Sequence, residues 1–140
     1  PSAAPEAGAT PWPGAYRGED VSTYRLSGLP DRVERDPAAR LTVRAQGDSA
    51  LELIVVDSSN GNTICTLEAT IAADRATIRP GQPCFEQQGE DTAVTASVTE
   101  GSATRSGGRL TLAATFALRL DFADTSLEGT LEYHFEGDRR

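Results

Sequence analysis

The segment RLTLAATFALRLDF, residues 109–122, alternates strictly between larger apolar side chains and smaller or polar ones. The first set comprises Leu110, Leu112, Ala114, Phe116, Leu118, Leu120 and Phe122. The second set comprises Thr111, Ala113, Thr115, Ala117, Arg119 and Asp121. A period of two indicates a β-strand with one buried face, whereas helical spacing would mix the two sets. A strand of this length spans about 40 Å, so we expect it to bend around a curved or closed sheet.

The same alternation recurs along the chain and predicts about eight strands. We expect them at residues 16–26, 40–46, 51–57, 63–72, 76–79, 93–100, 109–122 and 127–136. Turn sequences such as Asn60-Gly61 separate them, and short links of this kind join neighbouring antiparallel strands. The predicted fold is all-β, a single antiparallel up-and-down barrel. A two-sheet β-sandwich is the alternative, because the same alternation would satisfy it.

Charge and hydropathy exclude several classes of function. The 140 residues carry 21 acidic and 13 basic side chains, a net charge of -8, which disfavours binding to nucleic acid or to an anionic membrane surface. No run of eighteen apolar residues occurs, so no transmembrane segment is expected. The sequence starts at Pro1 without a methionine or a leader pattern, and we expect a trimmed chain.

The composition divides the chain into three parts. Residues 1–13 hold four prolines and predict a flexible Pro/Ala-rich tether, in which Trp12 is expected to pack as a plug on the barrel. Residues 14–137 form the predicted barrel domain, and residues 138–140 a tail. The two longest connections are residues 27–39 and 80–92. In the first, Pro30 is expected to open one helical turn that brings Leu29 and Val33 together.

The order of the predicted strands resembles the lipocalin-like, or calycin, barrels. Gly14-Ala15-Tyr16 stands where that family has Gly-x-Trp at the start of its first strand, with Tyr in place of Trp. A late arginine, Arg119 or Arg139, would correspond to the arginine that closes over that ring in the family. The family's second motif is absent. The resemblance implies a secreted barrel that binds an apolar small molecule at its mouth or serves as a scaffold for protein interactions.

The two cysteines favour a disulfide between Cys65 and Cys84, with two buried thiols as the alternative. Cys65 shares the inward parity of its strand, and Cys84 lies in the connection 80–92, so the bond would pin that connection to the barrel. Closing a loop of this length contributes about 3 kcal/mol in the chain-entropy model. Zinc is not expected, because no second cysteine pair or nearby histidine is present.

No catalytic residues are predicted, and we expect neither a metal nor a cofactor. His134 is the only histidine, and its parity places it on the polar face of the last strand. The acidic groups lack the regular spacing of a calcium loop, although the sequence leaves open whether a loop holds calcium. The sequence therefore predicts a protein that is not an enzyme.

The leading interpretation is a binding domain of the bacterial cell envelope, periplasmic, secreted or held as a lipoprotein by a lipid anchor upstream of Pro1. Its partner would be a protein or an apolar small molecule. The loops at the barrel mouth are the expected contact region, with Leu29, Val33 and Phe85 as candidate contacts. The alternative is a secreted protease inhibitor that acts through residues 1–13.

Overall fold

The computed structural model describes residues 11–140, so residues 1–10 of the tether expected at residues 1–13 lie outside the described part. Nine strands make up the fold, and no helix occurs among the described residues. The strands are β1 (Gly14–Leu26), β2 (Arg32–Ala45), β3 (Ala50–Val56), β4 (Thr63–Ala72), β5 (Arg75–Ile78), β6 (Pro83–Gln88), β7 (Thr92–Ser106), β8 (Arg109–Phe122) and β9 (Thr125–Arg139). None of the described segments is therefore a helix that could cross a membrane.

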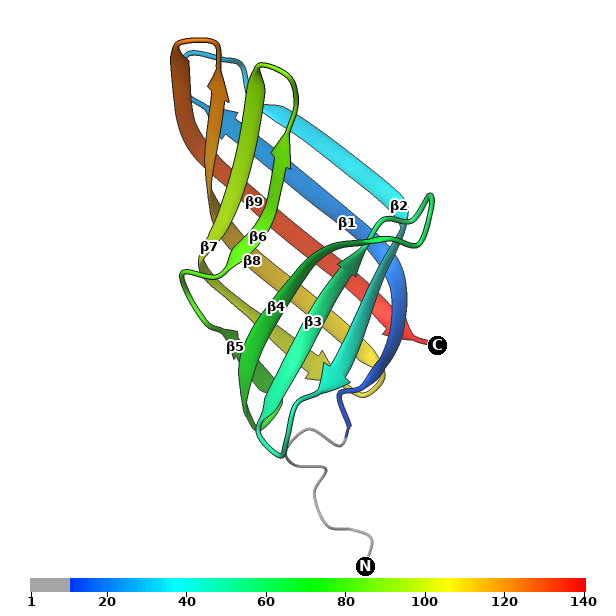
Figure 1. The fold of residues 1–140 in the computed structure, drawn as a ribbon. Helices are drawn as coiled ribbons and strands as arrows, with labels where there is room; N and C mark the ends of the chain where they lie inside the picture. Colours follow the sequence, from blue (N-terminus) through cyan, green and yellow to red (C-terminus); the bar gives the residue numbers. More distant parts are fainter. Residues whose placement is uncertain (1–10) are drawn as a thin grey trace, which may run out of the picture.

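The strands form one antiparallel sheet in the order β5-β4-β3-β2-β1-β9-β8-β7-β6, and a further pairing of β5 with β7 closes it. Strand β7 has two partners in succession. Its residues 93–97 pair with β6, and its residues 102–104 pair with β5. Eight strands thus complete the barrel and β6 is an additional strand (Figure 1). Closure confirms the predicted up-and-down barrel and excludes the sandwich.

Several predicted strands are confirmed, and two connections were predicted wrongly. Strand β8 has the predicted bounds, and β9 returns to pair with β1. The helical turn expected within residues 27–39 is absent, because residues 32–36 pair as an extended strand with residues 20–24 of β1. The connection 80–92 contains β6, which pairs with β7. Strand β9 continues to Arg139, beyond the predicted start of the tail at residue 138.

The closed end of the barrel is filled with side chains. Its largest apolar residues are at most 1% exposed, namely Trp12, Tyr16, Leu41, Leu51, Leu53, Leu67, Leu110, Leu112 and Phe135. Trp12 is completely buried, as expected for a plug, and its carbonyl oxygen accepts a 2.7 Å hydrogen bond from the Tyr16 hydroxyl. Close packing of this kind leaves no room for a ligand inside the closed end.

The other end is open. Strands β1, β2, β7, β8 and β9 extend past the shorter β3, β4 and β5, and Figure 1 shows their loops gathered at one end of the molecule. Residues 32–36 of β2 pair only with β1, since β3 begins its pairing at Arg40. Strand β6 pairs only with β7. The wall of the barrel is therefore interrupted between β2 and β6, and we call this region the mouth.

Candidate functional site

The mouth holds a cavity of about 530 Å³ between β1, β2 and their connecting loop on one side and β4, β6 and β7 on the other. Its lining is mainly apolar, with one ion pair at the edge: Tyr24, Leu26, Leu29, Pro30, Arg32, Glu34, Ile64, Phe85, Gln87 and Val94. Tyr24, Leu26 and Phe85 pack on the core, whereas Leu29 is 50% and Ile64 44% exposed. An apolar hollow with a few polar groups at its border is typical of a ligand or partner site.

The three residues expected to make contacts do not lie together. Leu29 and Phe85 both line the mouth cavity. Val33 does not, because Arg32 and Glu34 on either side of it line the cavity and successive side chains of a strand point to opposite faces. Val33 is 53% exposed and lies opposite Thr23 of β1. A helical turn would have brought Leu29 and Val33 together, but the extended strand separates them.

Sequence reasoning missed several residues of this site. Tyr24 and Leu26 share the inward parity of Tyr16 on β1, whereas the irregularity in the β1–β2 pairing between Gly18 and Asp20 changes the parity of the inward residues along β2. Ile64 was assigned to an ordinary strand, and nothing in its immediate sequence shows that the opposite wall is missing there. The parity of β1 was the one available signal, because Tyr24 and Leu26 share it with the buried Tyr16.

A disulfide between Cys65 and Cys84 joins β4 to β6 beside the cavity, which confirms the predicted pairing. The neighbouring Gln82 is 7% exposed and acts as a second connection. Its side-chain oxygen accepts a 2.7 Å bond from the Glu68 amide, and its side-chain nitrogen donates a 2.8 Å bond to the Glu68 carbonyl. The Gln82 side chain thus makes the backbone hydrogen bonds to β4 that a neighbouring strand would otherwise make. Both connections fix the start of β6, and with it the position of Phe85.

A small polar network lies deeper in the barrel, below the mouth. The Tyr133 hydroxyl donates a 2.8 Å hydrogen bond to Asp20 Oδ2, and Asp20 lies opposite Asp36 in the β1–β2 register. The Ser58 hydroxyl donates a 2.6 Å bond to Asp36 Oδ2. Burial raises the pKa of Asp20, and the nearby charge of Asp36 raises it further. Burial also raises the pKa of Tyr133, so the phenol remains a neutral donor.

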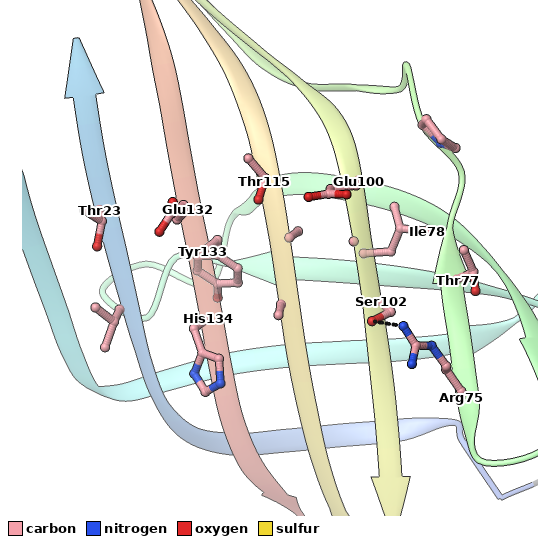
Figure 2. A pocket seen from close by; sticks show the side chains of 15 residues that line it. Thr23, Arg75, Thr77, Ile78, Glu100, Ser102, Thr115, Glu132, Tyr133 and His134 are labelled. Atoms are coloured by element: carbon pink, nitrogen blue, oxygen red, sulfur yellow. Dashed lines mark hydrogen bonds between the residues drawn. The ribbon is translucent and has the colours of Figure 1, made fainter.

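A second hollow, of about 620 Å³, lies on the outer surface of the barrel (Figure 2). Outward residues of adjacent strands meet there in two rows across the sheet. One row contains Val21, His134, Ala113, Ser102 and Thr77. The other contains Thr23, Glu132, Thr115 and Glu100. Figure 2 shows these side chains spread over the strands, and the only bond drawn is the one that Arg75 donates to Ser102, at 3.3 Å.

His134 lies on this outer surface, which confirms the position predicted from its parity. Its side chain is 47% exposed, and Nε2 lies 3.6 Å from Glu136 Oε1. It is not enclosed with a hydroxyl and a carboxylate in the arrangement that general-base catalysis requires. Within residues 11–140 no three His, Cys, Asp or Glu side chains are grouped so that they could hold a metal ion.

Of the two candidate late arginines, Arg139 lies near the start of β1 and Arg119 does not. The Arg139 Nη1 atom donates a 2.8 Å bond to the Pro11 carbonyl at the closed end. Burial raises the pKa of Tyr16, and the charges of Arg139 and Arg105 lower it in part, so Arg139 lies close to the ring at the start of β1. Arg119 instead pairs with Asp121 at 3.1 Å, near the β8–β9 turn at the opposite end.

Fold and cavities together define a closed eight-strand antiparallel barrel with a packed base and an open, partly apolar mouth. Comparison with known proteins adds no family to this description: no family model, no curated protein and no solved structure matches the chain.

Proposed function

We propose that this protein is a non-enzymatic binding domain that receives an apolar group of its partner in the mouth cavity. One observation carries the proposal: the base of the barrel is filled, whereas the mouth keeps an apolar hollow of about 530 Å³. Leu29 and Ile64 are exposed there. Exposed apolar surface that borders a hollow marks a binding site more often than isolated exposed residues do.

The proposed location is outside the cytoplasm, in the bacterial cell envelope or as a secreted protein. The disulfide between Cys65 and Cys84 supports it, because such bonds persist in oxidising compartments. The eight-strand barrel, with Arg139 beside the start of β1, supports a lipocalin-like origin. The inhibitor alternative depends on residues 1–13, of which residues 1–10 lie outside the described structure.

Fluorescence of the neutral apolar probe N-phenyl-1-naphthylamine tests the proposal. We expect emission to rise on binding to the wild-type protein, and Leu29→Asp to weaken binding by about tenfold, because a carboxylate in contact with an apolar ligand loses hydration. Val33→Asp is the matched control. Its exposure, 53%, is close to the 50% of Leu29, but it does not line the cavity. The proposal fails if the probe does not bind or if both variants weaken binding equally.

A further inference from the structure

Negative charge is concentrated at the mouth end of the barrel. Residues 25–34, 86–91 and 119–128 carry eight carboxylates and three arginines, a net charge of -5 out of -8 for the whole chain. Backbone bonds join these segments: the Ser27 amide donates to the Glu128 carbonyl at 3.1 Å, and the Ala123 amide donates to the Asp91 carbonyl at 3.1 Å. The segments therefore form one continuous rim (Figure 1).

The three arginines of the rim are already paired. Arg25 contacts Asp31 at 3.2 Å, Arg32 contacts Glu34 at 3.3 Å, and Arg119 contacts Asp121 at 3.1 Å. Four exposed carboxylates, those of Glu86, Glu90, Asp91 and Asp124, have no arginine partner among residues 11–140. All four belong to β6, the β6–β7 loop or the β8–β9 turn. The uncompensated charge is thus on the β6 side of the mouth.

The two free strand edges at the mouth differ in their ability to accept another strand. On β2, Pro37 has no amide hydrogen, and the Ala38 amide donates a 2.9 Å bond to Asp36 Oδ1. A proline and a side chain that takes up a backbone donor both protect an edge from further pairing. On β6, residues 85–88 contain no proline, and within the described structure they pair with β7 alone. Of the two edges, that of β6 borders the uncompensated carboxylates, and we therefore take it as the docking edge.

We propose that the occupant of the mouth is an extended, lysine- or arginine-bearing segment of a partner protein, which adds as a strand to residues 85–88 of β6. This inference rests on the proposed function and specifies the partner. Strand addition supplies backbone hydrogen bonds, while alternate side chains enter pockets beside the edge. One apolar side chain of the segment would fill the cavity next to Phe85. Its cationic side chains would face Glu86, Glu90, Asp91 and Asp124.

The charge arrangement predicts which partner chemistry is excluded. An acidic segment would meet four uncompensated carboxylates, and like charges across an interface oppose association. A second copy of this chain would bring an equally acidic rim to the same place, so self-association through β6 is disfavoured. A basic segment would associate faster and more tightly at low ionic strength, because surface charges are screened over about 10 Å at 0.1 M salt.

Fluorescein-labelled peptides provide the test. The probes are short peptides in which lysine alternates with threonine around a central leucine, phenylalanine or tyrosine. Their matched controls replace lysine with glutamate, or methylate the backbone nitrogens on one edge. We expect at least one lysine peptide to bind, with an affinity that falls about tenfold as salt rises from low to physiological concentration. The glutamate peptides should not bind, and methylation should weaken binding about tenfold, because it removes donors needed for strand pairing.

Two triple variants of equal net charge locate the contact. Glu86→Gln/Glu90→Gln/Asp124→Asn removes charge from the rim and should weaken binding of the lysine peptide about tenfold. Glu19→Gln/Asp48→Asn/Glu100→Gln removes the same charge away from the rim and should leave binding unchanged. Hydrogen–deuterium exchange with bound peptide should slow at residues 85–88 and remain unaltered at residues 32–38.

The possible failures are distinct. If the neutral naphthylamine probe binds but no lysine peptide does, the inference is overturned and the proposed function stands, with a small molecule as the ligand. If neither binds, both are wrong. Equal weakening by the two triple variants would show attraction by net charge alone, and unchanged binding of the methylated peptides would exclude strand addition. Either result overturns the inference.

Discussion

The Tyr133 hydroxyl donates a 2.8 Å hydrogen bond to Asp20 Oδ2 and so joins the side chains of neighbouring strands β9 and β1 inside the barrel. Tyr133 is 9% exposed, and it belongs to the core cluster that includes Phe135. Burial removes water from around the Asp20 carboxylate, and the phenol of Tyr133 supplies a hydrogen bond in its place. The carboxylate also faces Asp36 across the strand pair. The contact between Tyr133 and Asp20 is therefore sensitive to the charge of Asp20.

The raised pKa of Asp20 predicts a pH-dependent contribution to stability. Because the folded protein binds this proton more tightly than the unfolded chain does, the group stabilises the fold below its unfolded pKa, and that stabilisation is lost as pH rises through the folded pKa. We expect Asp20→Asn to gain stability relative to the wild type between about pH 3 and about pH 7. Urea unfolding of both proteins across that range measures the difference. A difference that stays constant with pH would contradict the assignment.

The disulfide should make a large contribution to the stability of the mouth side of the barrel. Replacing both Cys65 and Cys84 by Ala should lower the free energy of unfolding by about 3 kcal/mol, because the unfolded chain regains the entropy of a loop whose ends are 19 positions apart. Denaturant titration gives the value. Wild-type protein in excess reductant is the control and should unfold near the same midpoint, since both samples lack the covalent link.

Trp12 should contribute to stability although it precedes the first strand. It is completely buried at the closed end, so Trp12→Ala should cost about 3–5 kcal/mol through lost contacts and a residual cavity. Trp12→Phe keeps an aromatic side chain at the position and should cost less. Trp12 is the only tryptophan, so tryptophan fluorescence measures the exposure of this side chain, and its emission should shift to longer wavelength on unfolding. Equal stability of Trp12→Ala and the wild type would show that the plug is dispensable.

Gly18 is required by a close approach of two strands. A Cβ atom there would lie 1.8 Å from the Glu136 carbonyl oxygen and 2.5 Å from Gly137 Cα, both of which are backbone atoms of β9. Gly18→Ala should therefore separate β1 from β9 and cost about 1–3 kcal/mol or more. Gly108→Ala is the control, because a Cβ atom at that turn has nothing within 4 Å. Thermal unfolding of both variants should show a lower midpoint only for Gly18→Ala.

The strands that the sequence predicted correctly are those with one buried face and one solvent-exposed face. Residues 109–122 alternate because β8 has the core on one side and water on the other, and the predicted bounds are those observed. The first half of β2 was missed because the interrupted wall leaves residues 32–35 exposed on both faces, and alternation disappears with the core. Strand β6 is short and starts with Pro83, so composition indicated a loop.

The candidate site was only partly predictable for the same reason. Leu29 and Phe85 could be selected as apolar residues in connections, and both line the cavity. Val33 was added through an assumed helical turn, and one wrong backbone conformation was enough to place it on the other face. Ile64 lines the cavity only because the barrel wall is interrupted beside it. That interruption is a property of the whole barrel and leaves no local pattern in the sequence.

The change of partner along β7, from β6 to β5, has a consequence for how this protein can vary. At the closed end, where β7 pairs with β5, every strand has a paired neighbour on both sides, so a substitution there disturbs contacts around the whole barrel. At the mouth, residues 85–88 and 32–36 have one neighbouring strand each, so new side chains there need little accommodation elsewhere. The molecule thus separates a part that must be preserved from a part that is free to adapt to new partners.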